Sequence, residues 1–140
     1  LRAGYAVLAA VEQEEASRLA TVRVRQPGDT PQGVVVDLLF ASSGIEREVV
    51  DAAETLEIQP GLVVPVASTG HLLALKVLAE APNRPQDAAD IVALLNVATA
   101  AQIEDARHAL RLVEERGFHR NKQLLDALDR ALHPDRRGAS

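Results

Sequence analysis

The segment Arg84–Ile91 reads RPQDAADI and sets two aspartates three residues apart at the start of an apolar stretch. Pro85 suits the first position of a helix, because its missing N–H would be unsatisfied there in any case. Asp87 and Asp90 then lie on the same side of that helix, so both carboxylates can face one target. Charged groups on an apolar helix are costly to bury without partners, and a cation is therefore expected nearby.

Lys76, on the preceding apolar helix, is the first candidate for that cation. In one interpretation it forms an ordinary surface pair with Glu80, four residues on, and Asp87 is favoured only because acids suit the first turn of a helix. In the other, the lysine meets phosphate oxygens beside carboxylates that orient it. The residues alone leave both interpretations open.

The rest of the chain reads as strands first and helices later. Strands are expected at 21–25, 34–40 and 62–67, a first helix from 45 to about 56, and later helices at about 69–81, 85–98, 101–116 and 122–132. The helix at 85–98 has apolar residues around most of its circumference and is expected to be covered on most sides. This order predicts an α+β fold with a short mixed β-sheet and a C-terminal helical bundle. The expected domains are 1–68 and 69–133, with a flexible tail at 134–140.

Asp37 lies mid-strand between two aliphatic residues. A modest explanation is a cross-strand ion pair with Arg23 or Arg25. A functional one is that a strand holds this carboxylate rigidly for Mg²⁺ or Mn²⁺, which prefer oxygen ligands.

Ser42 and Ser43 precede the first expected helix and resemble a small phosphate-binding turn. Helix capping explains them equally well, because Glu46 follows Ser43 at the spacing of a capping box. The four histidines have no metal-ligand spacing.

Composition narrows the function classes. The net charge of −5 argues against general electrostatic binding of nucleic acid, although a small basic cluster at 116–122 allows a weaker hypothesis of a helical DNA-binding regulator. No apolar run approaches the ~20 residues of a membrane span and no signal peptide is evident, so a cytoplasmic protein is expected. The absence of methionine, even at Leu1, is typical of the interior of a longer protein, and we expect a fragment.

Four segments taken together carry a family resemblance: Val34–Glu46, Val63–Ala67, His71–Lys76 and Arg84–Ile91. In this order they resemble a nucleotidyltransferase-fold protein, of the group of minimal nucleotidyltransferases and AbiEii/AbiGii-type toxins of bacterial toxin-antitoxin and phage-defence systems. The chain departs from that pattern, because no Gly-Ser turn and no Asp-x-Asp pair precede Asp37.

The resemblance implies roles for four residues. Asp37 matches the family's third acid, a catalytic carboxylate and ligand of Mg²⁺ or Mn²⁺. The implied phosphate-binding residues are Lys76, Asp87 and Asp90. Ser42 and Ser43 remain further candidates for phosphate binding because of the turn that they form before the first expected helix.

The implied reaction is in-line attack on the α-phosphate of a nucleoside triphosphate, with transfer of a nucleoside monophosphate to an RNA or protein acceptor in the complete protein. By itself the chain is expected to be inactive, and an antitoxin is a candidate partner. The alternative is a non-catalytic helical interaction module or a degenerate family member. A module of this kind predicts a large exposed apolar patch on the helical half.

Overall fold

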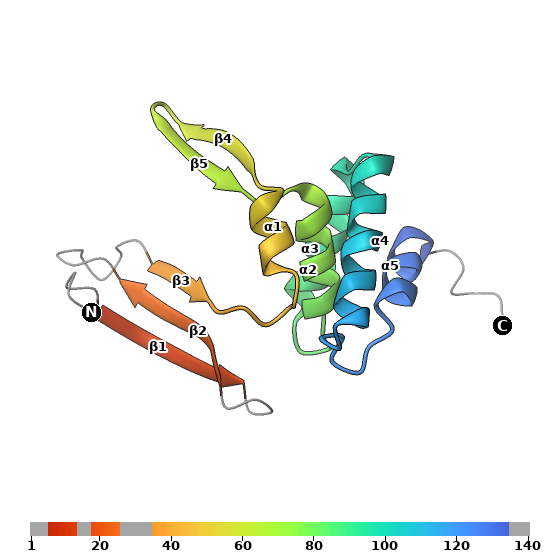
Figure 1. Cartoon of the computed structure of the whole chain (residues 1–140), viewed down its shortest axis with the longest axis horizontal. Coiled ribbons are helices and arrows are strands. Elements are labelled where there is room, and N and C mark those ends of the chain that lie inside the picture. The colour runs from red at the N-terminus through yellow and green to blue at the C-terminus, as the bar shows by residue number, and fades with distance from the viewer. Residues whose placement is uncertain (1–5, 14–17, 26–34, 135–140) are drawn as a thin grey trace. The chain divides into compact units, whose positions relative to one another are not determined.

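The computed structural model describes residues 6–13, 18–25 and 35–134. The chain divides into two compact units, residues 1–42 and residues 43–140 (Figure 1). By compactness the division thus falls between Ser42 and Ser43, whereas the sequence suggests one near residue 68. Of the tail expected at 134–140, only Pro134 belongs to the described residues.

The first unit is a three-stranded antiparallel sheet of β1 (Ala6–Gln13), β2 (Arg18–Arg25) and β3 (Val35–Leu39), in the order β1-β2-β3. In the β2–β3 ladder, Arg23 lies opposite Asp37. Every strand pair in the described part of the chain is antiparallel, so the expectation of a mixed sheet is wrong there. The physical reason is that consecutive strands pair directly, without the crossover helix that parallel strands need.

The second unit opens with α1 (Glu46–Asp51), followed by a hairpin of β4 (Glu54–Gln59) and β5 (Leu62–Val66). The helix expected to continue to about residue 56 ends at residue 51, because the next residues pair with β5 instead. Between the strands stands the two-residue loop Pro60-Gly61. Gly61 has φ +78°, as the third residue of a type II turn, with proline at the second position, requires.

Four helices complete the unit: α2 (Thr69–Ala79), α3 (Pro85–Val97), α4 (Ala100–Glu115) and α5 (Leu124–Leu132). The α+β order of short sheets followed by a helical bundle is therefore confirmed. Local signals explain the helix starts, since the Ser68 side chain caps α2 and Thr99 and Gln102 form a reciprocal capping box on α4. None of the described helices has the length and apolar character needed to cross a membrane.

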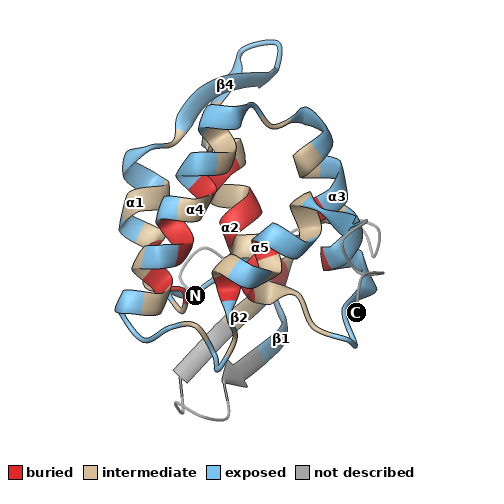
Figure 2. Ribbon diagram, turned by 90° about the vertical axis from the view of Figure 1, so that its right-hand side faces the viewer, coloured by how far each residue is buried: buried red, intermediate tan, exposed pale blue. Residues whose placement is uncertain are grey.

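The hydrophobic core lies between α2, α4 and α5, whose inner faces carry most of the buried residues (Figure 2). Its largest fully buried side chains are Ile45, Leu73, Val77, Leu110, Val113, Leu124 and Leu128.

The burial of helix α3 differs from the expectation. Only Asp87 and Ile91 are buried in it, and Val92 and Val97 are 58% and 73% exposed. The prediction that this helix is covered on most sides is wrong, because the bundle packs against one edge of its apolar surface.

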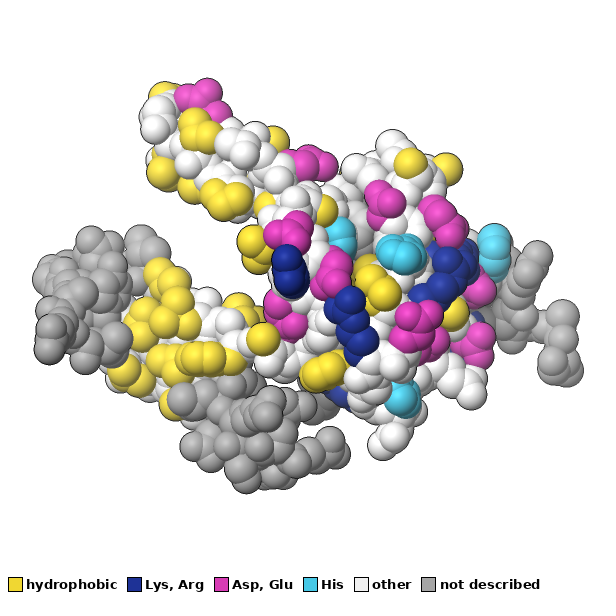
Figure 3. Space-filling model, in the orientation of Figure 1, with side chains coloured by type: hydrophobic (Ala, Val, Ile, Leu, Met, Phe, Trp, Pro, Cys, Tyr) yellow, Lys and Arg dark blue, Asp and Glu magenta, His cyan; other side chains and the backbone are white. Residues whose placement is uncertain are grey.

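Hydrophobic side chains are also exposed on the β-structure. On the hairpin, Leu56, Ile58, Leu62 and Val63 are each about half exposed, and Figure 3 shows hydrophobic side chains along it. Neither face of this two-stranded sheet is buried along its length. An isolated hairpin has marginal stability in water, so its stability depends on the connection to the helices.

Candidate functional site

The ammonium group of Lys76 on α2 joins two carboxylates of α3. Lys76 Nζ lies 3.0 Å from Asp87 Oδ1 and 2.7 Å from Asp90 Oδ2. Gln86 donates a hydrogen bond to Asp90 Oδ1 at 3.0 Å, and Arg84 Nε lies 2.7 Å from Asp87 Oδ2. We call these five residues the Lys76 cluster. The structure therefore brings together three of the six predicted site residues.

Burial within the Lys76 cluster is uneven. The Asp87 side chain is only 3% exposed, whereas those of Lys76, Asp90 and Arg84 are 35%, 32% and 56% exposed. The Arg84 N–H is not directed at Asp87, whose Oδ2 atom has no hydrogen-bond donor among the described residues. A buried carboxylate thus anchors a lysine whose ammonium group remains partly open to solvent.

The cluster favours the charged forms of Lys76 and Asp90. The pKa of Lys76 lies above its ordinary value, first because Asp90 accepts a hydrogen bond from it and then because Asp87 does; partial burial opposes the shift. The pKa of Asp90 lies below its ordinary value, because Lys76 and then Gln86 donate to its carboxylate. The Lys76–Glu80 pair of the first interpretation is not the one formed, since the lysine reaches across to α3 instead of along its own helix.

Asp37 belongs to the first unit and pairs there with Arg23. Its two carboxylate oxygens accept hydrogen bonds at 2.7 and 2.8 Å from Nε and Nη2 of that arginine. The arginine, first by hydrogen bonding, lowers the pKa of Asp37. Of the two arginines considered from sequence, the one directly opposite in the strand register is the partner. Asp37 is therefore charged, and its two oxygens are engaged in a bidentate pair.

The Ser43 turn is tied to α1. Ser43 is buried, and its backbone N–H donates to Glu46 Oε1 at 2.6 Å. The serine hydroxyl accepts a hydrogen bond of 3.4 Å from the Ile45 N–H. Ile45 stands at the N-cap position, so half of the expected capping box forms, two residues before the N-cap. The Ser43 groups considered for phosphate are therefore hydrogen-bonded within this turn, and Ser42 precedes them in the other unit.

Two cations of the basic cluster at 116–122 are used inside the fold. Arg116 donates to the carbonyl oxygen of Gly44 and lies 2.6 Å from Glu48 Oε1. Lys122 donates to the carbonyl oxygens of Leu78, at 2.7 Å, and of Glu80. These contacts oppose the hypothesis of a DNA-binding surface. No sequence pattern indicated them, because the partners are 42 to 72 residues apart.

No group of three or more histidine, aspartate or glutamate side chains in the described ranges is placed to hold a metal ion. Around Lys76, the two carboxylates already have cationic partners. The cluster can present one ammonium group to an anion, and its carboxylates can hold that group in place. Comparison with protein-family models found no match, and comparison with curated proteins also found none.

Proposed function

We propose that the chain is the C-terminal part of a nucleotidyltransferase-like protein. In the complete protein it would transfer a nucleoside monophosphate from a nucleoside triphosphate to an RNA or protein acceptor. One observation carries the proposal: the ammonium group of Lys76, partly open to solvent, is held between Asp87 and Asp90. The family resemblance assigns phosphate binding to this lysine and these two carboxylates.

The arrangement suits a phosphate-facing lysine. Asp87 is buried and fixed on the first turn of α3, so its ion pair with Lys76 restrains the flexible lysine side chain. A restrained cation loses less conformational entropy when it binds an anion. The resemblance assigns Asp37 to Mg²⁺ or Mn²⁺, and a rigid strand carboxylate suits such a metal chemically. To ligate the metal it would have to release Arg23.

The test is a transfer assay on the native protein, whose length an intact-mass measurement determines first. Labelled nucleoside triphosphates, Mg²⁺ and either total RNA or cell protein are supplied, and label incorporation is measured. Lys76→Met should reduce incorporation by at least about tenfold, and Lys76→Arg should restore part of it. Arg111→Met is the control, because it removes a cation that is 45% exposed on α4. Equal activity of the Lys76→Met and Arg111→Met variants, both folded by urea titration, would contradict the proposal.

A non-catalytic interaction module is the second candidate, favoured by the exposed apolar side chains of Val92 and Val97 on α3. In this case the Lys76 cluster only ties α2 to α3. Lys76→Met should then change the free energy of unfolding and leave nucleotide affinity unchanged. A cytoplasmic location and an antitoxin partner stay predictions under either candidate.

A further inference from the structure

Arg84 is a cation of the Lys76 cluster that has no role in the transfer reaction as described so far. Its Nε atom lies 2.7 Å from Asp87 Oδ2, but the N–H is not directed at that oxygen, so charge alone holds the pair. The guanidinium group donates no hydrogen bond within the described part of the chain. Its side chain is 56% exposed. The several N–H donors of this arginine are therefore available to a ligand at the surface.

Asp87 holds two cations at once, one on each oxygen. Lys76 Nζ lies 3.0 Å from Oδ1, and Arg84 Nε lies beside Oδ2. The buried carboxylate thus separates two basic groups that are both partly open to solvent. An anion contacts both groups only if its charged oxygens extend past that carboxylate. The oxygens of two linked phosphate groups spread further apart than those of a single phosphate, so the spacing of the cations favours a polyphosphate chain.

The surroundings of Asp87 carry more cations than carboxylates. Lys122 approaches from the segment before α5, and its ammonium group contacts carbonyl oxygens and no carboxylate of the described residues. The pKa of Lys122 lies below its ordinary value, first because the ammonium group is partly buried and then because Arg120 repels its charge; Arg84 repels it further. The region gathers four basic residues and three acidic ones: Lys76, Arg84, Arg120 and Lys122 against Glu80, Asp87 and Asp90. In a chain with a net charge of −5, this local excess of positive charge favours an anion.

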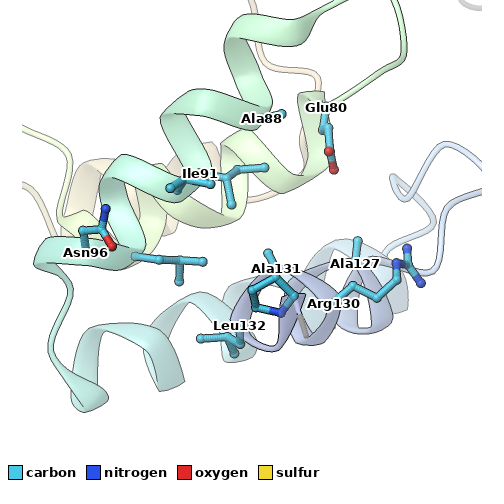
Figure 4. Close-up of a pocket in the computed structure, with 11 residues that line it drawn as sticks. Glu80, Ala88, Ile91, Asn96, Ala127, Arg130, Ala131 and Leu132 are labelled. Atoms are coloured by element: carbon cyan, nitrogen blue, oxygen red, sulfur yellow. The ribbon is translucent and has the colours of Figure 1, made fainter. Parts of the chain in front are cut away.

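Glu80, the third of these carboxylates, belongs to a neighbouring apolar groove between α3 and α5. It is one of the residues that line this groove, and Figure 4 shows its side chain directed into the space between the two helices. The groove is lined by neither Lys76 nor Arg84. The two cations are therefore separate from the groove, and the carboxylates directly beside them are Asp87 and Asp90, which are already paired.

We infer that Lys76 and Arg84 bind two adjacent phosphate groups of a polyphosphate chain, and that Arg84 makes the site prefer such a chain to a single phosphate. The inference rests on the proposed function, in which the ligand is a nucleoside triphosphate, and adds the residue that contacts a second phosphate group. An arginine suits this role because its planar fork binds phosphate through two hydrogen bonds. The N-terminus of α3, which begins at Pro85 without a side-chain cap, adds partial positive charge next to Arg84.

The test measures binding of inorganic tripolyphosphate and of inorganic phosphate to the whole chain, by isothermal titration calorimetry at low salt. The wild type should bind tripolyphosphate at least about tenfold more tightly than phosphate. Arg84→Met should weaken tripolyphosphate binding by at least about tenfold and phosphate binding by less than about twofold. Lys76→Met should weaken the binding of both anions.

Two further variants control for folding and for net charge. Arg84→Lys keeps a cation beside Asp87 but lacks the planar fork, and it should still reduce the preference for tripolyphosphate by at least about threefold. Arg111→Met removes a cation that is 45% exposed on α4, and it should leave both affinities unchanged. Urea titration establishes that each variant is folded.

The outcomes separate this inference from the proposed function. If Arg84→Met leaves the preference for tripolyphosphate unchanged while Lys76→Met weakens binding, the inference fails and the proposed role of Lys76 stands. If Lys76→Met binds both anions as the wild type does, or if the wild type binds neither anion, both fail. If Arg111→Met weakens tripolyphosphate binding as much as Arg84→Met does, net charge alone attracts the anion and the inference fails.

Discussion

Lys122 Nζ lies 2.7 Å from the carbonyl oxygen of Leu78 and also donates to that of Glu80. The last carbonyl groups of a helix have no partners within it. A lysine from the segment before α5 therefore closes the end of α2, directly before the linker that leads to Asp87. The Lys76 cluster thus depends on a residue well outside it.

Lys122→Met should lower the free energy of unfolding by about 1–3 kcal/mol, because the carbonyl groups lose a charged donor and stay partly buried. Urea titration measures the change. Lys122→Arg, which keeps a donor, should recover part of the loss. A loss no greater than that caused by Arg111→Met on the exposed surface of α4 would refute the role of Lys122 as a cap.

Asp87 should matter more for stability than Asp90. Asp87→Ala removes the buried partner of Lys76 and Arg84, and we expect a loss of about 1–3 kcal/mol. Asp90→Ala removes a partner that is one-third exposed, so the expected loss is smaller than that of Asp87→Ala. Urea titration of both variants under the same conditions gives the comparison. The reverse order would mean that Asp90 anchors the lysine.

The contribution of Lys76 to stability should be constant through the neutral range. Its pKa is raised in the folded state, so its contribution is complete below the ordinary lysine pKa and is lost only as the pH rises through the folded value. The pKa of Asp90 is lowered, so its contribution disappears only at acidic pH. Unfolding of the wild type and of Lys76→Met, followed from pH 5 to pH 9, should differ by a constant amount. A difference that changes across this interval would show that the cluster titrates there.

Glu48 should generate acid sensitivity. Its pair with Arg116, reinforced by a backbone hydrogen bond, lowers the pKa of Glu48 to about 2. A carboxylate whose folded pKa is depressed contributes stability above its ordinary pKa of 4.5 and loses that contribution as the pH falls toward 2.

Glu48→Gln should therefore reduce the dependence of the unfolding free energy on pH between 4.5 and 2. A double-mutant cycle with Arg116→Gln isolates the pair, because Glu48→Gln should add little once Arg116, which also donates to the carbonyl oxygen of Gly44, has been replaced. Fully additive effects would indicate that the two residues act separately.

Gly70 should not accept a side chain. A Cβ atom there would lie 2.6 Å from the Gln102 carbonyl oxygen and 2.9 Å from Asp105 Cβ, both on α4. Gly70→Ala should thus destabilise the protein by about 1–3 kcal/mol, by forcing α2 and α4 apart. Thermal and urea unfolding measure the effect. If the helices could separate without cost, the substitution would instead stabilise α2 by up to about 1 kcal/mol.

The helix starts were predictable because their signals are local. Ser68 caps α2 and Thr99 caps α4, and each accepts a hydrogen bond from a backbone N–H three residues later. Pro85 begins α3, at a position where a backbone N–H would have no partner within the helix. The end of α1 was not predictable in the same way. The residues after Asp51 have to pair with β5, and this pairing outweighs the helical preference of the segment.

The candidate site was predictable only in part, for a similar reason. Asp87 and Asp90 share a helix face by their spacing, and the need for a cation follows from burial. Which cation reaches them depends on how α2 crosses α3, and no spacing along the chain contains that information. The partners of Arg116 and Lys122 depend on packing in the same way.

Lys76 and Lys122 are the only lysines in the sequence. In the folded chain the ammonium group of Lys76 contacts two carboxylates of α3, and that of Lys122 contacts carbonyl oxygens at the end of α2. Acylating reagents need a free, deprotonated amine. The rate at which each lysine side chain is labelled therefore reports how often its ammonium group leaves these partners. The chain thus contains two intrinsic reporters of these contacts, one at the candidate site and one at the cap that supports it, and neither requires a substitution.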